Sequence, residues 1–296
     1  MIQSTVYLVY NIKDMYKILE KQELNSTVTR MKILAPLVAS KALPGQFIIL
    51  RVSDKGERIP LTISDYDREE GSISIIFQIV GATTLELNNL NVGDSILDFV
   101  GPLGNPTNLE GVEKVCIIGG GVGCAIALPI AKYLKSNNKN VTSIVGFKNK
   151  DLIILEDDFK KNSDRLIVTT DDGSYGIKGN VTGPLKELLL NEKFDKVITI
   201  GPLIMMKFVV ATCKEFNIPC DVSMNPIMID GTGMCGGCRL TLYIDGQKVT
   251  KFACVDGPDF NGYEIDFDEA MSRNAFYREQ ERKAYDDKCN LLKGSK

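Results

Sequence analysis

Asp230-Gly-Thr-Gly-Met-Cys235-Gly-Gly-Cys238 and Phe252-Ala253-Cys254-Val255-Asp256-Gly257-Pro258 are the two stretches around which this chain is organised. The first holds two cysteines in a glycine-rich loop, where backbone without Cβ atoms can fold tightly around bridging sulfides. A predicted hairpin brings the third cysteine back toward this loop. Its expected strands are Arg239–Tyr243 and Lys248–Phe252, joined at Asp245-Gly246. The three thiolates are therefore expected to converge on one inorganic centre.

A carboxylate stands where a fourth ligand is needed. The chain has no histidine. The plant-type [2Fe-2S] spacing places its first cysteine five residues before its second, and here that position is Asp230. The pattern predicts one [2Fe-2S] cluster, with the ligands Asp230, Cys235, Cys238 and Cys254. A zinc site with the same four ligands, and a purely structural set of buried cysteines beside a turn aspartate, are the alternatives.

Composition restricts the class of protein. A chain of 296 residues can form two or three domains. Its 35 basic and 38 acidic residues give a net charge of −3, which creates no field for a polyanion, so we expect no nucleic acid partner. Eight cysteines scattered along a long chain favour a reducing cytoplasm. No apolar run approaches the roughly 20 residues that span a bilayer, so we expect no membrane partner.

Short β-type runs separated by turns fill residues 16–110. Regular short strands with glycine and proline between them predict an antiparallel β-barrel. The expected strands are Tyr16–Leu19, Val28–Leu34, Gln46–Val52, Ile73–Val80 and Ser95–Val100. Residues 1–15 are interpreted as an extension, with Met15 as a possible start.

Two stretches of the predicted barrel carry ligand-binding chemistry. Arg58–Ser64 combines a cation, a rigid proline and hydroxyls on one strand, a set that can hold a ring edge and a diphosphate. Gly81–Thr84 opens a helix expected over Leu85–Leu90, whose N-terminus can receive the same diphosphate. An ordinary helix cap is the alternative for the second stretch. The candidate residues are Arg58, Pro60, Leu61, Thr62, Ser64, Gly81, Thr83 and Thr84.

Residues 111–224 alternate apolar strands with helices, which predicts a doubly wound parallel sheet. The strand Lys114–Ile118 runs into Gly119–Gly123 and a helix over Ala125–Leu134, so that backbone N–H groups and the helix dipole can face a pyrophosphate. The second strand, Val141–Phe147, is not followed by the acidic residue that would bind a ribose 2′-hydroxyl. This pattern therefore does not separate NAD from NADP.

Other loops should lie at the same edge of this sheet. Asp171–Gly176 and Gly201–Met206 follow the expected strands Leu166–Thr170 and Lys196–Ile200, and ligands of such sheets bind at the carboxyl ends of the strands. Loops shaped only for helix packing are the alternative. The candidate residues are Gly119, Gly120, Gly121, Gly123, Asp172, Gly173, Gly201, Pro202 and Met205. The remaining expected elements are helices over Val181–Leu190 and Met205–Phe216 and a strand over Pro219–Ser223.

The C-terminal part follows the cluster stretch. Residues 225–268 form the predicted [2Fe-2S] domain, and residues 269–296 a C-terminal helix and tail. The helix is expected over Glu269–Tyr285, and the polar tail Asp286–Lys296 is expected to fray. The buried side of the helix is expected to hold Ala270, Met271, Ala275 and Phe276.

The order of barrel, dinucleotide domain and cluster loop resembles the ferredoxin-reductase-like flavoproteins. The stretches that carry the resemblance are Arg58–Ser64, Gly101–Asn105, Gly119–Gly123, Asp172–Gly179, Gly201–Met206 and Asp230–Pro258. Within that superfamily the chain is similar to the electron-transfer subunit of dihydroorotate dehydrogenase B and to the small subunit of NADH-dependent reduced ferredoxin:NADP oxidoreductase. Asp230, with Met224–Met228 and Phe252–Pro258, looks more like the second.

The resemblance implies FAD on the barrel, NAD(H) on the second domain without excluding NADP(H), and a [2Fe-2S] cluster in the third. The cofactors would carry the electrons, and no side chain is assigned a catalytic role. It further implies a heterodimer with a larger flavin and iron-sulfur oxidoreductase subunit, and ferredoxin as an indirect partner. Electron bifurcation by that complex stays open. The alternatives are the dihydroorotate dehydrogenase role and a redox-sensing module without turnover.

Overall fold

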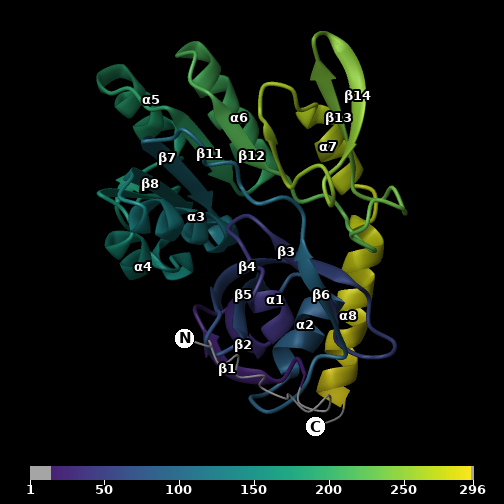
Figure 1. Ribbon diagram of the computed structural model, residues 1–296. Helices are drawn as coiled ribbons and strands as arrows, with labels where there is room; N and C mark the ends of the chain where they lie inside the picture. The colour runs from purple at the N-terminus through teal and green to yellow at the C-terminus, as the bar shows by residue number, and fades with distance from the viewer. Residues whose placement is uncertain (1–14, 295–296) are drawn as a thin grey trace, which may run out of the picture.

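The computed structural model describes residues 15–294, with side chains through residue 290 (Figure 1). The stretch interpreted as an N-terminal extension lies, apart from Met15, outside the described residues. The chain forms three regions, which contain a sheet of six strands, a sheet of seven strands and a two-stranded hairpin. None of the helices within the described residues is long and apolar enough to cross a membrane.

The first region is the predicted antiparallel barrel, with strand order β1-β2-β5-β4-β3-β6. In β2, Met31 and Ile33 are fully buried while Arg30 and Lys32 point outward, because side chains alternate across a strand. The bounds are β1 (Ile18–Glu23), β2 (Val28–Leu34), β3 (Phe47–Arg51), β4 (Ile59–Asp67), β5 (Ser72–Gln78), β6 (Asp98–Leu103), α1 (Pro36–Ala39) and α2 (Ala82–Asn89).

Three expected elements of the barrel begin at other residues than predicted. The first strand begins at Ile18 and the last at Asp98, so each lies two or three residues later than expected. Helix α2 begins at Ala82, before the expected Leu85, because the Thr84 hydroxyl accepts hydrogen bonds from the backbone N–H groups of Val80 and Gly81 at 3.0 Å. This local cap starts the helix one turn earlier than its apolar pattern indicates.

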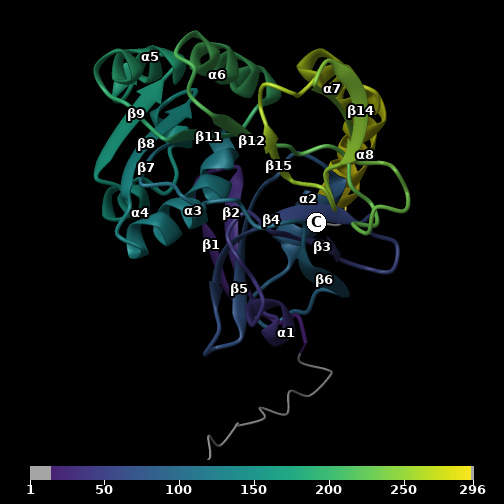
Figure 2. The same cartoon turned by 45° about the horizontal axis from the view of Figure 1, so that its top comes forward.

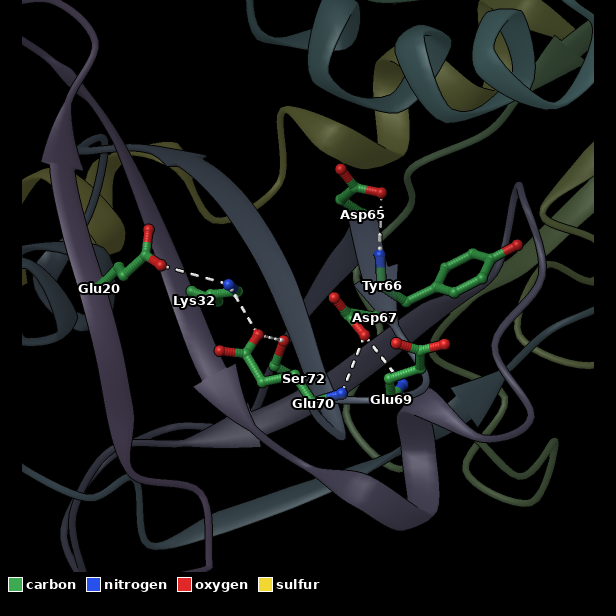
Figure 3. A network of polar contacts seen from close by, with 8 residues as sticks. All are labelled: Glu20, Lys32, Asp65, Tyr66, Asp67, Glu69, Glu70 and Ser72. Carbon is green, nitrogen blue, oxygen red and sulfur yellow. Dashed lines mark hydrogen bonds and ion pairs between the residues drawn. The ribbon is translucent and has the colours of Figure 1, made fainter. Parts of the chain in front are cut away.

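A surface network joins the barrel strands at the β4–β5 turn (Figure 3). Lys32 lies between Glu20, at 3.2 Å, and Glu70, at 2.7 Å. The Asp67 carboxylate accepts two backbone N–H bonds at 2.9 Å from Glu69 and Glu70 and so closes the turn. Hydrogen bonding to Glu70 raises the pKa of Lys32. The network therefore stabilises the hairpin and lies outside the candidate sites.

The second region is the predicted parallel sheet, with order β10-β9-β8-β7-β11-β12-β15. Its five central strands run parallel, as expected. The bounds are β7 (Lys114–Gly120), β8 (Asn140–Phe147), β9 (Arg165–Thr170), β10 (Ile177–Lys178), β11 (Lys196–Ile200), β12 (Cys220–Ser223), α3 (Cys124–Ser136), α4 (Glu156–Lys161), α5 (Thr182–Asn191) and α6 (Leu203–Glu215). Helices α3 and α4 pack on one face, and α5 and α6 on the other (Figures 1 and 2).

The third region begins with the predicted hairpin, β13 (Arg239–Ile244) and β14 (Gln247–Phe252). Asp245 and Gly246 have φ of 51° and 77°, the positive values that a two-residue hairpin turn requires. The chain then forms β15 (Asp259–Asn261), which pairs antiparallel with β12 (Figure 2). The cluster region is thereby joined to the edge of the nucleotide sheet.

The C-terminal segment differs from the expected single helix. It forms α7 (Phe267–Asn274) and α8 (Arg278–Gly294), separated near Ala275. Of the expected buried side only Ala270 is buried, and Phe276 is 75% exposed. The expectation that the tail from Asp286 frays is wrong as far as Gly294, because α8 lies against the barrel helix α2 (Figure 1).

Candidate functional site

The donor groups of the cluster loop lie in two pairs. The sulfur atoms of Cys238 and Cys254 are 3.1 Å apart and buried. Asp230 lies beside Cys235, because its Oδ2 accepts the backbone N–H of Cys235 at 3.1 Å. A [2Fe-2S] cluster held by four protein ligands needs two on each iron. The two pairs fit that requirement.

The grouping of the donors bears on the kind of metal centre. Within residues 15–290, no three histidine, cysteine, aspartate or glutamate side chains meet closely enough to hold one ion. The donors are instead divided between one pair, half-buried Asp230 and exposed Cys235, and the buried pair of Cys238 and Cys254. The two pairs of donors match the two irons of a [2Fe-2S] cluster, and this grouping supports the two-iron interpretation.

Glycines shape this loop and let it approach the barrel. Gly231 and Gly233 have φ of 79° and 83°, a backbone conformation that L side chains rarely adopt. A Cβ on Gly231 would come within 2.8 Å of the side chains of Ile49 and Leu103. The loop therefore packs directly on β3 and β6, and the donors are held close to the barrel.

Hydrogen bonds and burial shift the pKa values of two of the donors. The Thr232 hydroxyl and then the Cys235 backbone N–H lower the pKa of Asp230 to about 2, so its carboxylate is ionised. Burial and the neighbouring Cys238 raise the pKa of Cys254 to about 12. A metal that binds here must therefore displace a proton from Cys254, whereas Asp230 is already charged.

A cavity of about 750 Å³ lies at the carboxyl edge of the nucleotide sheet. Six of the candidate residues line it: Gly120, Gly121, Gly123, Gly201, Pro202 and Met205. The barrel forms the opposite wall through Asn25, Thr27 and Gln78. Gly119 is not at the wall, because it packs under Cys124, and Asp172 and Gly173 also lie outside the lining.

The glycines of this loop have different roles. Gly121 has φ of 55°, and a Cβ there would meet no atom within 4 Å, so its missing side chain leaves free space on the cavity side. A Cβ on Gly120 would lie 2.4 Å from the sulfur of Met205, and one on Gly123 would lie 2.4 Å from the carbonyl oxygen of Ile200. Gly123 is therefore required for close packing against the backbone at the end of β11, whereas a side chain on Gly120 would displace the flexible side chain of Met205 in α6.

The neighbouring aspartates after β9 are not equivalent. Asp172 accepts hydrogen bonds from the backbone N–H and the hydroxyl of Ser174, at 2.9 and 2.7 Å, and so caps a turn. Asp171, which the sequence did not single out, lines the cavity together with Lys148. Lys148 follows the end of β8 and Asp171 follows the end of β9, and these ends are paired, with Phe147 as the partner of Thr170. That parallel pairing was the signal that could have found Asp171.

The barrel candidates occupy β4 and the start of α2. Arg58 is exposed immediately before β4, and Pro60, Leu61 and Thr62 are half-buried within it. Ser64 is buried and donates to the carbonyl of Ser74 at 2.9 Å, so its hydroxyl serves the barrel. Thr83 is buried, and Thr84 caps α2, as the alternative interpretation expected. Gly81 has open space where a Cβ would lie.

Comparison with known proteins defines the class. Residues 225–266 match the family model of the iron-sulfur cluster binding domain of dihydroorotate dehydrogenase B. The electron transfer subunit homolog of dihydroorotate dehydrogenase B (NAD(+)) in Thermotoga maritima is 49% identical over 91% of this chain and 94% of its own length. The corresponding subunit of Streptococcus pneumoniae strain R6 is 33% identical over 82% and 94%.

A solved structure is similar over nearly the whole chain. It is the NADH-dependent reduced ferredoxin-NADP oxidoreductase, described for flavin-based electron bifurcation. One of its chains is 48% identical, with a TM-score of 0.86 over 92% of this chain and 97% of that chain. Fold and site together define an iron-sulfur flavoprotein subunit of the ferredoxin-reductase-like class. The chain belongs to the family of dihydroorotate dehydrogenase B electron-transfer subunits and their homologues.

Proposed function

We propose that this chain is the NAD(H)-linked electron-transfer subunit of a heteromeric NADH-dependent reduced ferredoxin:NADP oxidoreductase. The observation that carries the proposal is the pairing of Asp230 with Cys235 beside the buried pair of Cys238 and Cys254. The 48% identity to a chain of that oxidoreductase supports it. The names of the curated relatives favour a second candidate, the electron-transfer subunit of dihydroorotate dehydrogenase B.

The candidate residues are proposed to bind three cofactors. FAD binds on the barrel between Arg58–Thr62 and the N-terminus of α2. NAD(H) binds in the cavity along Gly120–Gly123, with its diphosphate at the N-terminus of α3, where N–H groups and the helix dipole favour an anion. The cluster binds to Asp230, Cys235, Cys238 and Cys254. When bound, the flavin would accept a hydride from NADH and release electrons singly to the cluster.

The orientation of NAD(H) follows from the neighbours of the cavity. Ser223 and Asn225 line the end next to β12, and β12 pairs with β15 of the cluster region. Lys148 and Asp171 line the opposite end. Because the nicotinamide must lie near the flavin and the cluster, we place it at the β12 end and the adenosine beside Lys148 and Asp171.

The protein itself orients the cofactors and limits water. The barrel residues Thr27 and Gln78 close the cavity on one side, and the apolar side chains of Ile204 and Met205 lie on the other. The cluster domain contacts the barrel through Gly231 and Gly104, where a Cβ would clash with neighbouring atoms. These contacts hold the cluster loop against the barrel.

A larger flavin and iron-sulfur subunit is the proposed partner, with ferredoxin acting through it, and the proposed location is the reducing cytoplasm. None of the eight cysteines, all within the described residues, is joined in a disulfide, which supports that location. Exposed apolar side chains near the cluster loop, including Met234 at 90% and Ile229 at 52%, support a protein partner there.

The test is anaerobic purification of the chain with its natural partner. The expected partner reduces NADP with electrons from NADH and ferredoxin, whereas copurification of a dihydroorotate-oxidising subunit would select the second candidate. NADH-driven reduction of ferricyanide by the purified chain separates both from a redox-sensing module. Absence of that reduction in protein loaded with FAD and iron would contradict the proposed function.

A further inference from the structure

The C-terminal helix α8 touches the barrel by one narrow face. Among its residues with described side chains, only Tyr285, Lys288 and Cys289 are half-buried, and the others are exposed. These three positions are spaced i, i+3 and i+4, so they form one stripe of the helix. Lys288 forms an ion pair with Glu86 of α2. The pair is partly shielded, because the two side chains are 33% and 21% exposed.

Glu86 is connected to both stretches that are proposed to bind FAD. It belongs to the second turn of α2, whose N-terminus carries Gly81 and Thr84. Its carboxylate is also hydrogen-bonded to the side chain of Ser53, in the loop that leads to Arg58. The Lys288–Glu86 pair therefore connects α8 to both walls of the proposed FAD site.

The charge of Glu86 opposes the proposed ligand. A diphosphate at the N-terminus of α2 is attracted by the helix dipole, but a carboxylate one turn further along the helix repels it. The ammonium group of Lys288 neutralises that carboxylate and holds it against α8. Loss of the pair would leave Glu86 unneutralised beside the site.

The other end of the C-terminal segment is attached to the cluster region. Arg273 of α7 donates to the carbonyl of Gly237 at 3.4 Å, next to Cys238. Glu269 of α7 pairs with Lys248 of β14 at 3.5 Å. The segment from α7 to α8 thus runs from the cluster loop to the barrel helix α2 (Figure 1).

We propose that Lys288 is a positioning residue of the FAD site, which neutralises Glu86 and fastens α8 across α2, and thereby strengthens FAD binding. The inference rests on the proposed function, because it presupposes FAD on the barrel. Lys288 does not touch the flavin in this proposal, since it acts through Glu86.

A charge-swap experiment tests the proposal. The FAD dissociation constant is measured by flavin fluorescence for wild type, Lys288→Glu, Glu86→Lys and the double variant Glu86→Lys/Lys288→Glu. Lys283→Glu is the matched control, because Lys283 lies on the same helix, is exposed and pairs with no described residue. Lys288→Arg keeps the charge and should bind FAD as the wild type does.

We expect the FAD dissociation constant of Lys288→Glu to be roughly three- to tenfold higher than that of Lys283→Glu. The reason is that the substitution replaces a partly shielded ion pair by two carboxylates that repel each other. The double variant should recover most of the loss. Equal constants for Lys288→Glu and Lys283→Glu, or no recovery in the swap, would overturn the inference alone. Wild-type protein that binds no FAD would overturn the proposed function and the inference with it.

Discussion

The Thr107 hydroxyl donates a 2.6 Å hydrogen bond to Oδ2 of Asp259 and so joins the barrel–nucleotide linker to β15. Ser223 of β12 bonds to the same carboxyl group. Its other oxygen, Oδ1, is buried without a partner among the residues that the structure describes. Burial raises the pKa of Asp259, although Lys196 nearby lowers it and Asp221 raises it further. One buried carboxyl group therefore connects the barrel–nucleotide linker, β12 and β15.

This raised pKa predicts a pH dependence of stability. Above the ordinary value of 3.8 the folded protein holds the proton of Asp259 more tightly than the unfolded chain does. Its contribution to the free energy of unfolding is therefore present at low pH and declines as the pH rises through the raised pKa. Asp259→Asn should remove that decline. Urea unfolding of both proteins across a pH series checks it, and a difference that does not vary with pH would contradict the prediction.

Replacement of Asp230 should change the cluster without removing the other ligands. Asp230→Cys should keep both irons but shift the electron paramagnetic resonance spectrum of the reduced protein and its potential, because thiolate donates more strongly to iron than carboxylate. Asp230→Ala should make the cluster labile. Three identical spectra from wild type and both variants would exclude Asp230 as a ligand.

Gly121→Leu should obstruct the nucleotide cavity. The side chain would fill the free space on the cavity side and raise the Michaelis constant for NADH about tenfold or more while FAD stays bound. Gly93→Leu is the control, because Gly93 also has positive φ, at 98°, and open space around it but lies outside the cavity lining. Steady-state kinetics distinguish the two, and an equal change in both would indicate backbone strain alone.

Asp171→Asn should weaken the preference for NADH over NADPH. The Asp171 carboxylate would repel a 2′-phosphate at the adenosine end, and its removal leaves Lys148 to attract one. The ratio of kcat/KM for NADPH to that for NADH should rise roughly tenfold. Asp172→Asn should leave this ratio unchanged, because Asp172 caps the turn at Ser174. A larger effect at Asp172 would reverse the assignment.

Arg58→Ala should yield protein that keeps its cluster but loses flavin. An arginine–phosphate bond is charge-assisted, so its loss should weaken FAD binding by roughly ten- to a hundredfold. Arg58→Lys should show a smaller loss, since the charge remains. Flavin and iron content after gel filtration give the result, and full flavin occupancy in Arg58→Ala would remove Arg58 from the site.

The sequence by itself determined the elements whose signals are local. The hairpin around Asp245-Gly246 and the strand Lys196–Ile200 follow from turn residues and apolar periodicity, and the parallel direction of the second sheet follows from the alternation of strands and helices; the structure confirms them. The close spacing of Asp230 and Cys235 also made their proximity predictable. Such features depend on neighbours a few residues apart, so backbone geometry restricts them strongly.

Tertiary structure alone decided what depends on distant partners. Asp171 lines the cavity beside Lys148 because β9 pairs in parallel with β8, while the adjacent Asp172 turns to Ser174. Helix α8 continues through the expected polar tail and meets the barrel at Glu86, 202 residues away from Lys288. Its sequence is rich in charged residues, and most of its described side chains are exposed. Contacts of this kind depend on long-range packing, which no local pattern encodes.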